Sequence, residues 1–213
     1  MIFMKAQSDI IAMIIIVIIS ISLVSFALLW GLPLIQKRQD ESIVNRVDRS
    51  FDTNNANSLP NKIVYIAKNK GEDTFTSETD GVWALNEYDS NNPGNMERNY
   101  IEFSFLSKAS KIAANNEWIP NLCGKLDGIL GENSAIVCGK TNVFQDNYNI
   151  TYKIWFRRLK ETDNRYHMIG LIKDPRGVSF SVGKNVRIMY DSVEEKTYSG
   201  ITYIITKVKI LLE

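Results

Sequence analysis

The rarest reactive side chains in the sequence are the thiols of cysteine and the imidazole of histidine. The 213 residues include one histidine, His167, and two cysteines, Cys123 and Cys138. A structural zinc site needs four Cys or His ligands and a catalytic site needs about three, so these residues predict no zinc centre. His167 stands alone in a strand-like run, RYHMIGLIK, a setting that favours half-buried packing over catalysis.

The two cysteines are the best candidates for a covalent cross-link. Each begins a Cys-Gly-Lys triplet, and the two positions are 15 apart in the sequence. Outside a reducing cytoplasm, two cysteines in one chain typically form a disulfide. Closing a loop of this size would stabilise the fold by about 3 kcal/mol in the chain-entropy model. We expect a Cys123–Cys138 disulfide; two free buried thiols and a redox pair are the alternatives.

Motifs for phosphate binding and for nucleophilic catalysis are missing from the sequence. It contains no Walker A loop, no G-x-G-x-x-G and no G-x-S-x-G. The acidic stretches at residues 72–73 and 78–80 lack the ligand spacing of an EF-hand loop, and they fit solvated loops better. We therefore expect no enzymatic activity, no cofactor and no metal site.

The charged residues are nearly balanced. There are 25 Lys and Arg against 24 Asp and Glu, which gives a formal net charge of +1. Nucleic-acid binding needs a basic surplus for phosphate contacts, so no nucleic-acid partner is expected. One local basic group, formed by Lys153, Arg157, Arg158 and Lys160, is explained by the protection of an edge strand.

One long segment near the N-terminus has the composition of a membrane span. The 21 residues from Ile10 to Trp30 carry no charge, and their only polar side chains are Ser20, Ser22 and Ser25. As a helix they would extend about 31 Å, close to the thickness of a bilayer core. A cleaved secretory signal has a shorter apolar region that ends at a small-x-small site. We therefore predict a retained transmembrane helix.

The sequence contains opposing signals for the orientation of this span in the membrane. Lys5 precedes it and Lys37 with Arg38 follows it, which by the positive-inside rule favours a cytoplasmic C-terminus. The cysteine pair and one N-glycosylation sequon, Asn149-Ile150-Thr151, favour a C-terminal region outside the cytoplasm. We expect the second arrangement, with Asn149 as a possible glycan acceptor.

The residues before the span resemble a known processing signal. Lys5-Ala6-Gln7-Ser8-Asp9, followed by the apolar run, is similar to the class III signal peptide of archaeal type IV pilin-like proteins. In that family a basic and a small residue precede the cut, and the helix after it stays in the mature subunit. The resemblance implies that a prepilin peptidase cuts between Ala6 and Gln7 on the cytoplasmic side.

The resemblance covers about 30 residues and has departures. Ala6 replaces the commoner Gly, and the fifth mature position, where many pilins carry an acidic residue, is Ile11; Asp9 is the nearby acidic side chain. Removal of residues 1–6 would delete Lys5 and leave 24 basic and 24 acidic residues, a balance that suits a dense polymer. The alternative is an uncleaved anchor in which Lys5 marks the cytoplasmic end.

Beyond Trp30 the apolar pattern becomes amphipathic. Ile35, Ile43, Val44, Val47 and Phe51 recur at helical intervals among polar residues. The sequence therefore predicts one helix over residues 7–51, which is membrane-spanning over 10–35 and amphipathic over 36–51.

A break is expected inside this helix and another after it. Gly31 and Pro33 predict a kink or local melting, because proline lacks an amide donor and clashes with the carbonyl of Leu29. Such a break would be an interfacial boundary or a flexible joint. Residues 52–60 (DTNNANSLP) are rich in turn formers and predict a linker.

The remaining residues, 61–213, predict a β-rich head. Short runs rich in β-branched and aromatic residues alternate with Gly, Asn, Asp and Pro. The predicted strands are Lys62–Lys68, Gly81–Tyr88, Tyr100–Leu106, Ser134–Cys138, Asn149–Leu159, Arg165–Lys173, Val186–Asp191 and Tyr198–Leu212. One or two helical turns are expected between Ser107 and Gly131. The predicted class is α+β, a long helix followed by a mainly antiparallel, sandwich-like head.

These features lead to one functional expectation and one alternative. The resemblance implies a structural subunit of an archaeal type IV pilus-like surface filament, assembled through its apolar helix. Its partners would be membrane lipid before assembly, related pilin subunits, a prepilin peptidase and the pilus assembly machinery. The alternative is a single-pass membrane protein whose extracytoplasmic β-domain binds a ligand or a partner protein.

Overall fold

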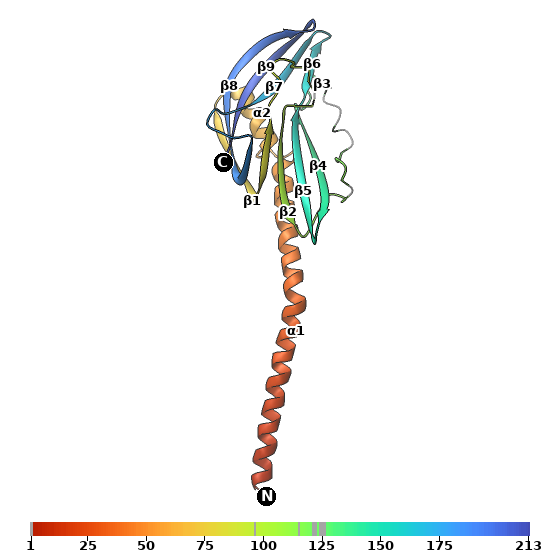
Figure 1. Cartoon of the computed structure of the whole chain (residues 1–213), viewed down its shortest axis with the longest axis vertical. Coiled ribbons are helices and arrows are strands. Elements are labelled where there is room, and N and C mark those ends of the chain that lie inside the picture. Colours follow the sequence, from red (N-terminus) through yellow and green to blue (C-terminus); the bar gives the residue numbers. More distant parts are fainter. Residues whose placement is uncertain (1, 96, 115, 121–122, 124–126) are drawn as a thin grey trace. The chain divides into compact units, whose positions relative to one another are not determined.

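The computed structural model describes residues 2–95, 97–114, 116–120, 123 and 127–213, with side chains from residue 12 onward (Figure 1). The chain divides into two compact units, Met1–Asp40 and Glu41–Glu213. The first unit is helix alone. The second holds the end of the same helix and all the described strands.

Helix α1 covers Ile2–Phe51 without interruption. The local melting expected at Gly31 and Pro33 is therefore wrong, because both residues lie within the helix. A proline removes one backbone hydrogen bond, and the hydrogen bonds of the neighbouring turns are enough to maintain the helix here.

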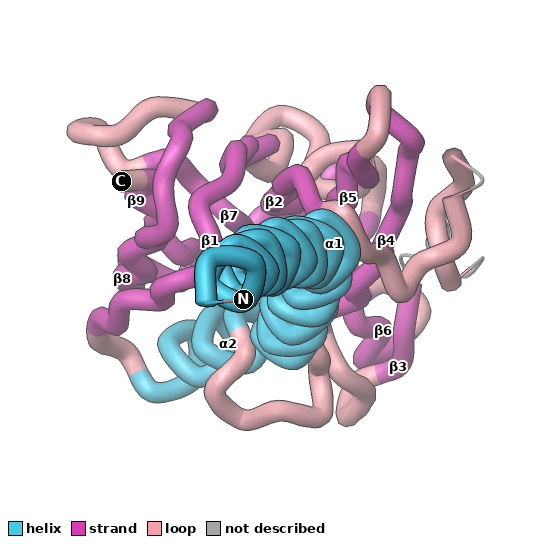
Figure 2. The backbone as a smooth tube through the Cα atoms, turned by 90° about the horizontal axis from the view of Figure 1, so that it is seen from below, coloured by secondary structure: helices cyan, strands magenta, loops and turns pink. Residues whose placement is uncertain are grey.

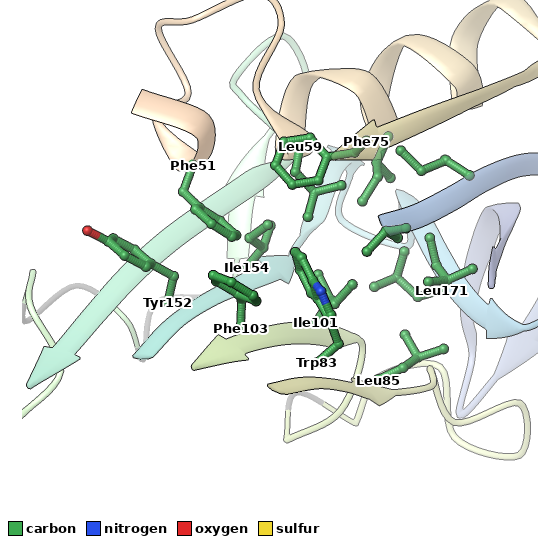
Figure 3. Close-up of a cluster of buried hydrophobic side chains, with 14 of the residues drawn as sticks. Phe51, Leu59, Phe75, Trp83, Leu85, Ile101, Phe103, Tyr152, Ile154 and Leu171 are labelled. Carbon is green, nitrogen blue, oxygen red and sulfur yellow. The ribbon is translucent and has the colours of Figure 1, made fainter. Parts of the chain in front are cut away.

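The last turns of α1 are part of the hydrophobic core of the second unit. Val44, Val47 and Phe51 are at most 1% exposed, as their three- and four-residue spacing predicts. The Phe51 ring stacks on Tyr152, with 4.9 Å between ring centroids, and on Phe103, with 5.7 Å (Figure 3). The amphipathic segment of the helix therefore folds with the head.

Helix α2 covers Leu59–Asn69 and replaces the strand predicted over residues 62–68. The prediction was wrong because KIVYIAK reads as a β-branched run, whereas its buried residues follow helical spacing from Leu59 to Ile63 and Ile66. Pro60, in the first turn, is compatible with a helix start because the amide it lacks would have no partner there. The connection between the two helices is residues 52–58.

The strands confirm the predicted mainly antiparallel α+β class. They are β1 (Glu72–Asn86), β2 (Tyr100–Ser107), β3 (Asp127–Ile129), β4 (Ala135–Phe144), β5 (Asn147–Phe156), β6 (Arg158–Thr162), β7 (Arg165–Lys173), β8 (Phe180–Tyr198) and β9 (Ile201–Leu212). All belong to one sheet in the order β3-β6-β7-β9-β8-β1-β2-β5-β4, rather than to two facing sheets. The pairs β3–β6 and β7–β9 are parallel, and the other neighbours are antiparallel.

The connection between β5 and β6 requires the sheet to curl. Only Arg157 separates these strands in sequence, yet each is second from an opposite end of the sheet order. The two ends of the sheet must therefore approach each other. The concave side that results contains α2 and the end of α1 (Figure 2).

Asn99 joins the two ends of the curled sheet. Its side-chain amide donates hydrogen bonds to the carbonyls of Phe156 and Ile169, at 2.8 and 2.7 Å, and its Oδ1 accepts one from the Leu171 amide at 2.8 Å. Asn99 is 3% exposed and has φ +70°, a conformation that asparagine tolerates better than most residues. It therefore links β5 with β7, which are not neighbours in the sheet.

Two loop predictions also need correction. Residues 72–80, expected in an acidic loop, form the first half of β1. Where helical turns were expected between Ser107 and Gly131, the described residues 108–114 and 116–120 have none, and Ile119 makes an isolated bridge with Gly139 of β4. Cys123 is in a 3₁₀ turn, in which its amide donates to the Pro120 carbonyl at 3.2 Å; its neighbours 121–122 and 124–126 lie outside the described residues. Hydrogen bonding to the sheet overrides the weak local helix preference in this segment.

Replacing Asn99 with glycine tests this link, because glycine accepts the positive φ and removes the side-chain hydrogen bonds, at the cost of a more flexible unfolded chain. We expect the free energy of unfolding to fall by about 3 kcal/mol, since buried backbone groups lose their partners. Urea denaturation of the detergent-solubilised chain, followed by tryptophan fluorescence, measures the change. The control is Asn69→Ala, which removes one exposed intrahelical hydrogen bond and should change stability by under about 0.5 kcal/mol. Equal effects of the two variants would contradict the assigned role.

Candidate functional site

The apolar part of α1 is a candidate membrane span. Over Ala12–Phe51 it is the one described helix long and apolar enough to cross a bilayer, and its apolar window has no buried residue. The large hydrophobic side chains from Met13 to Ile35 are 50–72% exposed. Ser22 donates its hydroxyl hydrogen to the Ile18 carbonyl at 2.7 Å, which reduces the cost of placing a hydroxyl in an apolar medium. An exposed apolar surface of this length suits lipid or other apolar helices as its surroundings.

Polar contacts fix the end of α1 to the sheet. The Tyr152 hydroxyl donates to Asp48 at 3.2 Å, and Lys111 pairs with the same carboxylate at 3.4 Å. Arg46 pairs with Glu78 of β1 at 3.2 Å. Burial, with the nearby Asp48 charge, raises the pKa of Tyr152 far above its usual range, so this tyrosine remains a hydrogen-bond donor. The final two turns of the helix are thus held by both apolar and polar contacts.

The structure confirms the predicted Cys123–Cys138 disulfide, with 6.2 Å between the Cα atoms. Cys138 is fully buried in β4, directly opposite Lys153 of β5, and Cys123 is 8% exposed. The bond attaches the segment before β3 to this part of the sheet. Free thiols are therefore excluded for this pair in the structure.

The predicted processing and glycosylation residues are not brought together. Lys5, Ala6 and Gln7 lie in the helical backbone of α1, and their side chains are outside the described residues. Asn149 lies in β5, paired with Leu106 and Asn142 on either side, and is half-buried. Cleavage and glycan attachment therefore remain predictions.

The remaining sequence candidates have structural partners. His167 lies on β7 with its Nε2 2.9 Å from Glu161, which also pairs with Arg165 at 3.1 Å. Among the acidic residues of β1, Glu72 pairs with Arg187 and Asp73 with Lys62. No group of His, Cys, Asp and Glu in the described part of the chain is arranged to hold a metal ion.

Lys153 lies in an aromatic box that sequence analysis did not find. Its ammonium is 4.1 Å from the ring centroid of Tyr100 and 4.6 Å from those of both Trp118 and Trp155, and it pairs with Glu102. Its assignment to edge protection was wrong, because β5 lies between β2 and β4. The available signal was alternation: Tyr100 with Glu102, and Lys153 with Trp155, occupy one face of paired strands. Trp118 comes from the segment held by the disulfide and could not be placed by alternation.

One cavity lies between α2 and the part of the sheet formed by β6, β7 and β9. Its volume is about 640 Å³, within the range that holds small ligands or protein side chains. Its apolar lining is Val64, Ala67, Leu130, Leu159, Met168, Ile169 and Ile204. His167 and Lys68 are among its polar residues. The lining suits a ligand or side chain that is apolar and lies next to a polar or acidic group, which Lys68 or His167 could contact.

Comparison with protein-family models, curated proteins and solved structures finds no match to this chain. What is established is the class: an α+β protein with one N-terminal helix that is long and apolar enough to span a membrane, and a disulfide-bonded β-rich head.

Removing the disulfide with Cys123→Ser and Cys138→Ser together should lower the free energy of unfolding by about 3 kcal/mol, because the unfolded chain gains the entropy of an open loop. Urea denaturation with and without a reductant measures this. Reductant should destabilise the wild-type chain by a similar amount and leave the double variant unchanged. Two titratable thiols in the denatured, non-reduced wild-type chain would show that the bond is absent.

Lys153 should make stability depend on pH. Burial lowers its pKa to about 8, whereas an unfolded lysine titrates near 10.4. Between about pH 8 and 10 the unfolded chain binds the proton and the folded chain does not, so stability should rise with pH across this window. The difference in free energy of unfolding between wild type and Lys153→Met, measured at pH 7, 8.5 and 10, should show this rise. A difference that is flat or falls with pH would contradict it.

Proposed function

We propose that the chain is a structural subunit of an archaeal type IV pilus-like surface filament. The observation that carries the proposal is an apolar helix surface that no described part of the chain covers, on a helix whose final turns belong to the core of the head. The Lys5-Ala6-Gln7 signal before this helix supports the same assignment. A helix that served only as a tether would not need to be part of the folded core of its cargo.

The proposed mechanism is polymerisation without catalysis. Before assembly, the apolar part of α1 would lie in the bilayer, with the head outside the cytoplasm. During assembly, lipid contacts would be exchanged for contacts with the helices of other subunits, at little net cost because both surroundings are apolar. The disulfide would stabilise the head outside the cell. After removal of residues 1–6 the subunit would be electrically neutral, so its polymer would accumulate no net charge.

The alternative function is a membrane-anchored β-domain that binds a ligand or partner protein. One observation favours it, the cavity of about 640 Å³ beside α2. An anchored binding domain needs neither leader cleavage nor polymerisation. The two functions therefore differ in the mature N-terminus and in the presence of filaments.

The N-terminal sequence of the membrane-extracted protein tests the proposal. We expect the mature chain to begin at Gln7 and electron microscopy to show filaments that contain it. Ala6→Leu should retain residues 1–6 and abolish the filaments, because the resemblance implies a small residue before the cut.

The matched control is Ala27→Leu, which makes the same change inside the apolar segment and should be processed normally. A mature chain that still begins at Met1 or Met4 would support the anchored domain instead. Processing without filaments would also contradict the filament role.

A further inference from the structure

The hairpin between β4 and β5 ends in two exposed apolar side chains. Val143 and Phe144, at the end of β4, are 66% and 55% exposed. They precede a tight turn in which Gln145 has φ +54° and Asp146 is exposed. The two neighbouring side chains form a small apolar patch at the tip, and a partner that covered it would remove this apolar area from water. We call Val143, Phe144 and Asp146 the hairpin tip.

The cavity beside α2 has the complementary character. Its apolar lining includes Val64, Leu130 and Ile204, and the volume of about 640 Å³ has room for one or two side chains. The hairpin tip presents apolar groups without a cavity, whereas this cavity presents apolar walls without a side chain to fill them.

The tip cannot reach the cavity of its own chain. Ser134, which lines the cavity, directly precedes β4, whereas Phe144 is the last residue of that strand. The ten residues of β4 span about 33 Å when extended. The two surfaces therefore lie at opposite ends of one rigid hairpin, and a contact between them requires two copies of the chain.

The charges at the two surfaces are also complementary. Asp146 makes no ion pair with any described residue, and neither does Lys68 at the cavity. The carboxylate that lines the cavity, Glu132, is paired with Arg157 at 3.0 Å, and Glu161 pairs with His167 and Arg165. An acidic group that approaches the cavity would therefore meet a free ammonium rather than an unpaired carboxylate.

We propose that the hairpin tip of one copy inserts into the cavity of the next copy, with Asp146 beside Lys68 of that copy. The proposal rests on the filament function. Because the two surfaces are different, the contact is heterologous, and it leaves one tip and one cavity free at the ends of any chain of copies. Such a contact can propagate along a filament when the rotation between successive copies does not close a ring, whereas a two-fold contact would stop at a dimer.

Cysteine cross-linking tests the geometry of the contact. The described cysteines are consumed in the native disulfide, so Phe144→Cys and Leu130→Cys can be introduced into the full-length chain in its native membrane. After mild oxidation, the double variant should give a ladder of covalent oligomers larger than dimers. Each single variant should give a dimer at most. Only dimers from the double variant would overturn the proposal.

A charge exchange tests the same contact without new bonds. Asp146→Lys and Lys68→Glu should each reduce filament number about tenfold by placing like charges together, and the two changes combined should restore it. Val178→Lys, which adds a charge at an exposed apolar position outside both surfaces, is the control and should leave the filaments unchanged. Filaments that are insensitive to the single changes, or are not restored by the pair, would contradict the contact alone. A wild-type chain that forms no filament would contradict the proposed function and the contact together.

Discussion

The structure depends on the burial of the last turns of α1 in the concave side of the curled sheet. Val44, Val47 and Phe51 are excluded from water, and Phe51 packs against rings from β1, β2 and β5. Without these side chains the inner face of the sheet would expose Trp83 and Phe103, which are now fully buried. The helix end is therefore part of the hydrophobic core of the head. Asp48 and Arg46 then fix its rotation through Tyr152 and Glu78.

This coupling divides α1 between two environments. From Met13 to Ile35 its large side chains have no protein around them, and from Val44 to Phe51 they form part of a protein core. The sequence changes at the same place, from an uncharged run to a helical stripe of apolar residues among charges. One secondary-structure element thus meets two demands of different physical origin: compatibility with an apolar surrounding, and shape complementarity with a sheet.

The sequence predicted those parts of the fold in which one local signal dominates. The uncharged run, the spacing of Val44, Val47 and Phe51, and the cysteine pair each correspond to the described structure. Prediction from the sequence failed where the local secondary-structure preference and the tertiary packing disagree. The run KIVYIAK is β-branched but folds as α2, because its apolar residues meet the sheet at helical intervals. The hydrogen bonds of Asn99 and the contact of Lys153 with Tyr100 join residues 50 or more positions apart, and no local pattern encodes such distances.

The passage of the chain from β5 to β6 has a mechanical consequence. An open sheet under tension can be unzipped strand by strand from a free edge. Here the strands second from each edge are consecutive in the chain, and Asn99 holds the same closure through hydrogen bonds. A force applied through the end of α1 therefore acts on a nearly closed ring, in which strands on both sides of the helix share the load. Peeling from an edge can release β3 or β4, but separating the strands behind them would also have to break the hydrogen bonds of Asn99 that join the two sides.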